Sequence, residues 1–261
     1  MKAKPAGKKA ATGRRARPAS RLQLAAGRHA AAAALTAGSL RELLAGPGAP
    51  GDLIRAVRGA GIGIVRCSRA RLDRLAGTPK HQNVIAVCAS RPQPGWRDMQ
   101  LGDDALLLAF DGVQDPRNIG ACLRNAAAFG VSALLVPRRN SASLSPAARK
   151  TAVGGDFSVP LQQVSNMARE LRALRDAGFR VFCADAAAKQ ELYRADLTGP
   201  AVWVFGSEQS GLRRITRDIC DLLVSIPLPQ AAAMGSLNVS VACGICLAET
   251  IRQRRGGRRN A

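Results

Sequence analysis

Ser236-Leu237-Asn238-Val239-Ser240-Val241-Ala242, running on through Cys243-Gly-Ile-Cys-Leu-Ala-Glu249, is the stretch that decides the predicted fold. It begins as a polar turn and becomes an amphipathic helix, for which Ser236 is the expected N-cap. Directly upstream, Ile226-Pro-Leu-Pro229 ends an apolar run, and residues 230–235 make an irregular connection. A strand, a loop and a polar helix start form a ligand-binding edge in an α/β sheet, although an ordinary strand-to-helix junction has the same pattern.

Strands and helices alternate regularly upstream of this stretch. We expect strands over 106–110, 131–136, 180–184, 201–205 and 222–226, and helices over 121–129, 146–153, 166–177 and 237–254. This alternation predicts a parallel sheet with helices on both faces. Three loops follow strand ends, 111–120, 206–211 and 227–236, at the edge where open α/β sheets bind ligands.

The N-terminal part predicts a smaller unit. Residues 21–92 read as a small α/β domain, with helices over 28–37, 52–58 and 68–75 and strands over 62–67 and 84–88. Residues 93–104 contain Pro and Gly and read as a linker. Residues 1–20 have basic but no acidic residues, which predicts a disordered tail attracted to phosphate, and residues 256–261 make a second basic tail.

The charge balance indicates the partner. Lys and Arg number 39 against 18 Asp and Glu, a formal net charge of +21. That excess predicts a polyanionic partner, nucleic acid first among the candidates. Aromatic residues are only 3% of the chain, so phosphate and sugar contacts are expected rather than base stacking. No stretch combines a basic face with an aromatic one, and no apolar run reaches membrane-spanning length, so we expect no membrane association.

The number and positions of the cysteines and histidines argue against metal sites and histidine catalysis. Seven cysteines lie scattered in apolar runs, which predicts buried free thiols in a reducing, cytoplasmic setting and no metal site. Only Cys243 and Cys246 are closely spaced. His29 and His81 both lie outside the C-terminal half, which disfavours histidine acid–base catalysis. Neither a Gly-x-Gly-x-x-Gly loop after the first strand nor a Walker loop is present, which disfavours dinucleotides and nucleoside triphosphates.

The three strand-end loops together resemble the motifs of a known family. Asp111-Gly-Val-Gln-Asp-Pro-Arg-Asn118-Ile-Gly-Ala-Cys-Leu-Arg124 is similar to the first motif of the SpoU-type (TrmH-like) RNA ribose 2′-O-methyltransferases. Gly206-Ser-Glu-Gln-Ser-Gly-Leu212 is similar to the second, and Ile226-Pro-Leu228 with Ser236–Ala242 to the third. The likeness covers roughly residues 105–255. Residues 21–92, with Gly27-Arg-His-Ala and Lys80-His-Gln-Asn-Val-Ile-Ala, resemble the family's ribosomal-protein-like substrate-binding domain.

Two features depart from the family pattern. Seven residues separate Leu228 from Ser236, where about five are usual, and Ser207, Gln209 and Ser210 stand where Gly or an acidic residue is frequent. Both departures fall on loops that should contact the cofactor.

The resemblance implies a function. It implies transfer of a methyl group from S-adenosylmethionine to an RNA ribose 2′-hydroxyl, in particular that of a guanosine in 23S rRNA. A tRNA ribose methyltransferase and a non-catalytic RNA-binding homologue are the alternatives. It further implies a deep trefoil knot and a homodimer, neither of which follows from periodicity.

The resemblance also assigns the site residues. The resemblance implies that Arg124 acts as a base once a phosphate engages it. Because a guanidinium is almost never deprotonated in proteins, we expect Arg124 instead to grip the phosphate and stabilise the developing alkoxide. Asn118 would orient the ribose or its loop. The competing interpretations are a surface salt bridge for Arg124 and an Asx-turn for Asn118. Glu208 could be only a solvated loop acid, and Ser236 only an N-cap. The implied catalytic set is Arg124, Asn118, Glu208, Ser236 and Asn238, and the implied cofactor-binding set is Phe205, Gly206, Ser207, Glu208, Gly211, Ile226, Leu228, Ser236, Leu237 and Asn238.

Overall fold

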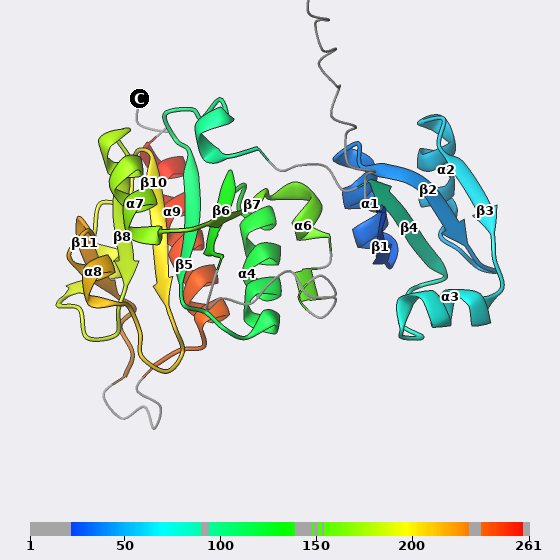
Figure 1. Ribbon diagram of the computed structural model, residues 1–261. Helices are drawn as coiled ribbons and strands as arrows, with labels where there is room; N and C mark the ends of the chain where they lie inside the picture. Colours follow the sequence, from blue (N-terminus) through cyan, green and yellow to red (C-terminus); the bar gives the residue numbers. More distant parts are fainter. Residues whose placement is uncertain are drawn as a thin grey trace, which may run out of the picture.

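A computed structural model describes residues 22–89, 94–138, 148, 151–152, 154–229 and 236–257. These residues form two sheets, a four-stranded one in the N-terminal part and a seven-stranded one in the C-terminal part (Figure 1). The predicted basic tails, the helix at 146–153 and the loop at 230–235 fall wholly or mostly outside the described residues.

The N-terminal sheet has the strand order β1-β4-β2-β3. Helices α1 and α2 cover one face around a core that includes Leu43 and Val57, and α3 covers part of the other face through Leu72. Strand β4 runs antiparallel to both β1 and β2, whereas β2 and β3 are parallel. The elements are β1 (Leu22–Ala26), α1 (Arg28–Thr36), β2 (Leu40–Ala45), α2 (Gly51–Gly59), β3 (Gly63–Arg66), α3 (Arg69–Ala76) and β4 (Val84–Ala89).

Local signals predicted the ends of α3. The Ser68 side chain accepts a hydrogen bond from the backbone N–H of Arg71, and Gly77 ends the helix at φ 61°, as expected of a left-handed C-cap. Strands β1 and β2 were not predicted. They are held by their pairing with β4, which the local sequence does not reveal.

The segment after the N-terminal sheet is anchored to the C-terminal sheet. The short helix η1 (Trp96–Asp98) buries Trp96, whose Nε1 donates to Glu170 Oε2 at 3.1 Å. Arg97 ion-pairs with the same carboxylate. The described part of the predicted linker, residues 94–104, is therefore packed rather than only connecting.

The C-terminal sheet has the order β7-β6-β5-β10-β8-β11-β9, and each neighbouring pair is parallel. Helices α4 and α9 pack on one face, and α7 packs on the other with Trp96. The elements are β5 (Leu106–Asp111), α4 (Pro116–Ala128), β6 (Ala133–Pro137), α6 (Gly155–Ser158), β7 (Leu161–Val164), α7 (Met167–Asp176), β8 (Arg180–Ala184), β9 (Gln190–Glu191), η2 (Leu192–Arg194), β10 (Ala201–Gly206), α8 (Arg214–Arg217), β11 (Leu222–Ser225) and α9 (Val239–Gly257).

Two helix starts differ from the prediction, and both matter for the site. Helix α4 begins at Pro116, so Asn118 is helical and not in a loop, and Asp115 caps the helix by accepting from Arg117 N–H at 2.8 Å. Helix α9 begins at Val239, and Asn238 Oδ1 accepts from Ser240 N–H at 2.9 Å. The prediction of Ser236 as N-cap is wrong, because Asn238 takes that position.

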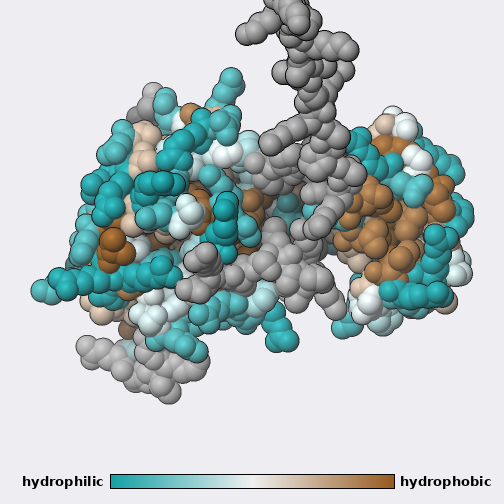
Figure 2. Space-filling model, viewed as in Figure 1, coloured by the Kyte–Doolittle hydropathy of each residue, from teal (hydrophilic) through white to brown (hydrophobic). Residues whose placement is uncertain are grey.

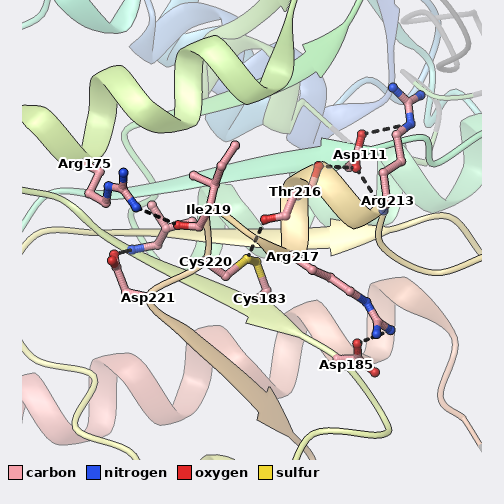
Figure 3. Close-up of a disulfide and its surroundings, with 11 residues drawn as sticks. Asp111, Arg175, Cys183, Asp185, Arg213, Thr216, Arg217, Ile219, Cys220 and Asp221 are labelled. Atoms are coloured by element: carbon pink, nitrogen blue, oxygen red, sulfur yellow. Dashed lines mark hydrogen bonds and ion pairs between the residues drawn. A yellow bond between two sulfur atoms is a disulfide. The ribbon is translucent and has the colours of Figure 1, made fainter.

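Two cysteines depart from the expected free thiols. Cys183 of β8 and Cys220 after α8 form a disulfide with a Cα–Cα distance of 6.0 Å (Figure 3). The remaining five cysteines are free and buried, as predicted. Burial raises the pKa of the Cys246 thiol, which keeps it protonated and unreactive.

The N-terminal and C-terminal parts of the chain contact each other through helices α1 and α6. Gly154, at φ 92°, comes so close to α1 that a Cβ there would lie 2.8 Å from the Ala33 Cβ. Hydrophobic residues gather on the surface of the N-terminal unit (Figure 2), and its large exposed apolar side chains are Leu22, Leu24 and Leu75. No helix among the described residues is long and apolar enough to cross a membrane.

Candidate functional site

A pocket of about 510 Å³ lies at the carboxyl ends of β8, β10 and β11. The segment leading into α9 closes it. This is the edge at which open parallel sheets bind ligands. The lining residues are Ala184, Asp185, Ala186, Phe205, Gly206, Ser207, Glu208, Gly211, Leu212, Arg217, Val224, Ile226, Leu228, Ser236, Leu237, Asn238, Val239 and Ala242.

All ten residues predicted to bind the cofactor line this one pocket. They come from the ends of β10 and β11 and from the start of α9, so segments far apart in sequence converge. The prediction missed the contribution of β8 and α8, including Asp185 and Arg217. Asp185 directly follows a predicted strand end, and that position was a usable signal.

Three of the predicted catalytic side chains form a hydrogen-bonded chain. Asn118 Nδ2 donates to Glu208 Oε1 at 2.7 Å, and Asn238 Nδ2 donates to Asn118 Oδ1 at 3.1 Å. Asn118 is 9% exposed, whereas the other two side chains are exposed. These hydrogen bonds join the first turn of α4 and the loop after β10 to the residue that precedes α9. The Asx-turn interpretation of Asn118 is wrong because its side chain bonds across these elements.

The loop after β10 is held tightly by its own backbone. Ser207 and Gly211 exchange backbone hydrogen bonds at 3.0 and 2.9 Å. A Cβ on Gly206 would lie 2.2 Å from the Gly211 carbonyl carbon, so only glycine fits at this position. The turn thus fixes the backbone that borders the pocket and the position of Glu208.

Asp111, at the end of β5, holds α8 beside the pocket. It is 2% exposed, and its Oδ2 accepts from Thr216 Oγ1 at 2.6 Å and from Arg213 N–H at 3.3 Å. Its Oδ1 lies 3.4 Å from Arg213 Nε (Figure 3). These contacts orient α8, which carries Arg217 at the pocket.

Arg124 does not line the pocket. It is exposed on α4 and borders a separate hollow with Ser240 and Val241 of α9. Among the described residues, no hydrogen bond or ion pair of its side chain is found, so the surface salt bridge is not observed there. The neighbouring Asn125 Nδ2 donates to Ser240 O at 2.9 Å, which ties α4 to α9. The chain therefore assembles Asn118, Glu208, Ser236 and Asn238, with Arg124 on an adjoining face.

The charge of the pocket suits a cation. Its charged lining residues are Asp185, Glu208 and Arg217, which leaves one surplus negative charge. A positively charged sulfur would be stabilised there. Within the ranges that the structure describes, no group of three His, Cys, Asp or Glu side chains could hold a metal ion.

Comparison with known proteins matches both parts of the chain. Residues 105–248 match the SpoU rRNA Methylase family, and residues 24–94 match the RNA 2′-O ribose methyltransferase substrate binding family. A protein of Shewanella oneidensis named 23S rRNA (guanosine-2′-O-)-methyltransferase RlmB is 44% identical over 207 residues, 78% of this chain and 83% of the relative. One of Nitrosomonas europaea with the same name is 44% identical over 77% of this chain and 78% of the relative.

Solved structures show the same architecture. The SpoU methyltransferase AviRb from Streptomyces viridochromogenes, in complex with AdoMet, has a TM-score of 0.74 and 26% identity, over 90% of this chain and 91% of that one. A structure described as an RNA 2′-O ribose methyltransferase has a TM-score of 0.74 and 28% identity, over 90% and 89% of the two chains.

Proposed function

The chain belongs to the SpoU rRNA Methylase family, and on that basis we propose that it methylates the ribose 2′-hydroxyl of a guanosine in 23S rRNA. It is an RNA 2′-O-ribose methyltransferase that uses S-adenosylmethionine. The observation that carries the proposal is the placement of the Glu208–Asn118–Asn238 hydrogen bonds at the edge of the pocket. The two relatives named 23S rRNA (guanosine-2′-O-)-methyltransferase RlmB, each 44% identical to this chain over most of its length, also support the proposal.

The residues of the pocket fit S-adenosylmethionine. Gly206, Gly211, Ile226 and Leu228 offer backbone groups and apolar surface, and the acidic surplus offsets a sulfonium charge. When bound, this cofactor supplies an electrophilic methyl group on a positively charged sulfur whose departure needs no acid. The protein's task is then to position the weakly acidic ribose hydroxyl in line with that methyl group.

We assign the positioning to the hydrogen-bonded side chains. Asn118 is buried and held from both sides, so it can fix the start of α4 and the loop carrying Glu208 against the ribose. Ser236 and Asn238 border the same pocket and can contact substrate or cofactor. Arg124 would bind the adjacent phosphate and stabilise the alkoxide, because a guanidinium stays protonated and offers a bidentate fork.

The position of Arg124 supports a homodimer. The hollow beside it exposes apolar surface that includes Val241, 48% exposed, with Phe129 and Ile245. We propose that a second copy covers this face of α4 and α9, so that Arg124 serves the pocket of its partner. A C2 interface of this kind would place two composite sites in each dimer.

Mixing two inactive variants tests this arrangement. Arg124→Ala and Asn238→Ala homodimers would each be inactive, but a mixed dimer would hold one intact site. Unfolding and reassembling an equal mixture should restore about a quarter of wild-type activity, because half of the dimers are mixed and half of their sites intact. Activity that stays at the level of the single variants would exclude shared sites, and sedimentation of the wild type would separately test the dimer.

The knot, the domain boundaries and the cellular location are also part of this proposal. We propose that α9 passes through a loop to form a deep trefoil knot, which is supported by the contribution of both 206–211 and 236–242 to one pocket. We propose residues 21–92 as the RNA-binding domain, 105–255 as the methyltransferase domain, and a cytoplasmic location, where rRNA is found.

Ribose-methylation mapping tests the function directly. rRNA and tRNA from cells with and without the protein should differ at one guanosine of 23S rRNA. A difference confined to tRNA would favour the tRNA alternative. Calorimetry with S-adenosylmethionine, with and without RNA, distinguishes a methyltransferase from a non-catalytic RNA-binding homologue, because the latter would bind no cofactor.

A further inference from the structure

Asp185 and Arg217 form an ion pair at the pocket (Figure 3). Asp185 directly follows β8, and Arg217 ends α8. The side chain of Asp185 is only 10% exposed and that of Arg217 is 44% exposed. Beyond their share in the net charge of the pocket, the function proposed above assigns neither residue a role.

The Asp185 carboxylate is held in a fixed orientation. Its Oδ1 accepts from Ala187 N–H at 2.9 Å, and its backbone N–H donates to Val224 O at 3.0 Å. Arg217 binds the other oxygen, and α8 is itself anchored by the contact of Thr216 with Asp111. Each carboxylate oxygen has more than one acceptor site, so the group can take further hydrogen bonds from a ligand that brings donors.

The sheet order decides which part of the cofactor lies near Asp185. Strands β5, β10 and β8 are consecutive neighbours, so the end of β8 is two strand spacings, about 10 Å, from the end of β5. The methyl group must lie beside Asn118 and Asn238, where the RNA ribose is positioned. The Asp185 side of the pocket therefore faces a part of the cofactor distant from the methyl group.

Two arms of the cofactor extend from its sulfur, the amino-acid end and the adenosine, and the adenosine is the one that carries a pair of hydroxyl groups. Its ribose carries two neighbouring hydroxyl donors, and an ionised carboxylate is an acceptor only, so the two are complementary. Acidic side chains at strand ends bind ribose hydroxyls in other α/β folds for the same chemical reason. Arg217 and the Ala187 N–H hold the carboxylate in position for such a contact.

We propose that Asp185, oriented by Arg217, accepts hydrogen bonds from the ribose hydroxyls of the cofactor and so selects a ribonucleoside. This inference rests on the proposed function, because it uses the position of the methyl group. Asp185 is a cofactor-binding residue in this assignment, and Arg217 is a positioning residue.

Binding measurements with matched ligands test the contact. Dissociation constants are measured by calorimetry for S-adenosylhomocysteine and for its analogues lacking the ribose 2′- or 3′-hydroxyl. The wild type should bind at least one analogue about tenfold more weakly, the effect of one charge-assisted hydrogen bond. In Asp185→Ala this preference should shrink to within about twofold, because the acceptor is gone.

The controls separate contact from structural damage. Asp218→Asn, one residue beyond Arg217 and outside the pocket lining, should keep the wild-type preference. Thermal unfolding shows whether each variant folds. A folded Asp185→Ala protein that keeps the preference for the full ribose, or that weakens all three ligands equally, overturns the inference and leaves the methyltransferase assignment intact. A wild type that binds none of the ligands, even with RNA, overturns both.

Discussion

The replacement Asn118→Asp would place two carboxylates against each other at the edge of the pocket. The Asn118 Nδ2 donor lies 2.7 Å from Glu208 Oε1, and the substitution puts an oxygen in its place. The second hydrogen bond survives, because a carboxylate can still accept from Asn238 Nδ2, now 3.1 Å from Asn118 Oδ1. The change therefore removes one interaction and adds one repulsion.

The magnitude follows from the exposure of the pair. Two like charges about 4 Å apart repel by about 1 kcal/mol in water and about 4 kcal/mol near a protein surface. Glu208 is exposed, so the lower part of this range applies. Adding about 1.5 kcal/mol for the lost hydrogen bond to a charged group gives a penalty of about 3 kcal/mol. If the hydrogen bond orients the ribose, kcat/KM falls about a hundredfold.

A second substitution should reverse the effect. Asn118→Asp combined with Glu208→Gln restores a donor–acceptor pair with its direction inverted. Methyl transfer from labelled S-adenosylmethionine to 23S rRNA, measured for the wild type, both single variants and the double variant, should show recovery of at least tenfold over Asn118→Asp alone. A double variant as slow as Asn118→Asp, with an unchanged melting temperature, would refute the role of this hydrogen bond.

Four other substitutions probe the pocket backbone and the packing of the large sheet. Gly206→Ala should weaken S-adenosylmethionine binding more than tenfold in calorimetry, because its Cβ would meet the Gly211 backbone at 2.2 Å. Gly211→Ala has open space around its Cβ, so it should cost about 1 kcal/mol of stability and should weaken S-adenosylmethionine binding less than Gly206→Ala does. Burial raises the pKa of Glu170, but the hydrogen bonds from Arg97 and Trp96 lower it below 4.5 on balance. Glu170→Gln should therefore lower the free energy of urea unfolding at pH 7 by about 1 to 3 kcal/mol. The gap to wild type should begin to close as pH falls below 4.5 and should vanish only below the lowered pKa, where the carboxyl is protonated in the folded protein as well; a gap independent of pH would contradict this. Cys220→Ser should lower stability by about 2 to 4 kcal/mol in thermal unfolding, and reductant should then destabilise only the wild type.

The periodic parts of the fold were predictable, and the exceptions have physical causes. The strands of the large sheet are buried on both faces and read as apolar runs, for which Leu106–Asp111 and Ala201–Gly206 are examples. Leu40–Ala45 has the sequence LRELLA, whose residues favour helix, but pairing with β3 and β4 makes it a strand. Tertiary pairing of this kind has no local signature.

The candidate site divides in the same way. The strand-end pattern predicted only the edge at which a ligand binds, and the individual site residues came from the resemblance of its three loops to the family's motifs. The helical position of Asn118 was missed although Asp115 and Pro116 form a standard helix start, a capping residue followed by proline. Asp185 and Arg217 meet because β8 and β10 are neighbours in the sheet and α8 follows β10. Arg124 lies outside the pocket of its own chain. The spacing of residues gives no information on either arrangement.

Helix α9 is the last described element of the chain, yet the core and the pocket both depend on it. Its Thr250 Oγ1 accepts from Trp203 Nε1 at 3.0 Å in the centre of the sheet, and its first turn follows Asn238 at the pocket. During synthesis, all the strands of both sheets leave the ribosome before this helix does. A nascent or truncated chain that lacks this helix thus has no completed cofactor pocket, and the capacity to modify RNA arises only after the helix has been made.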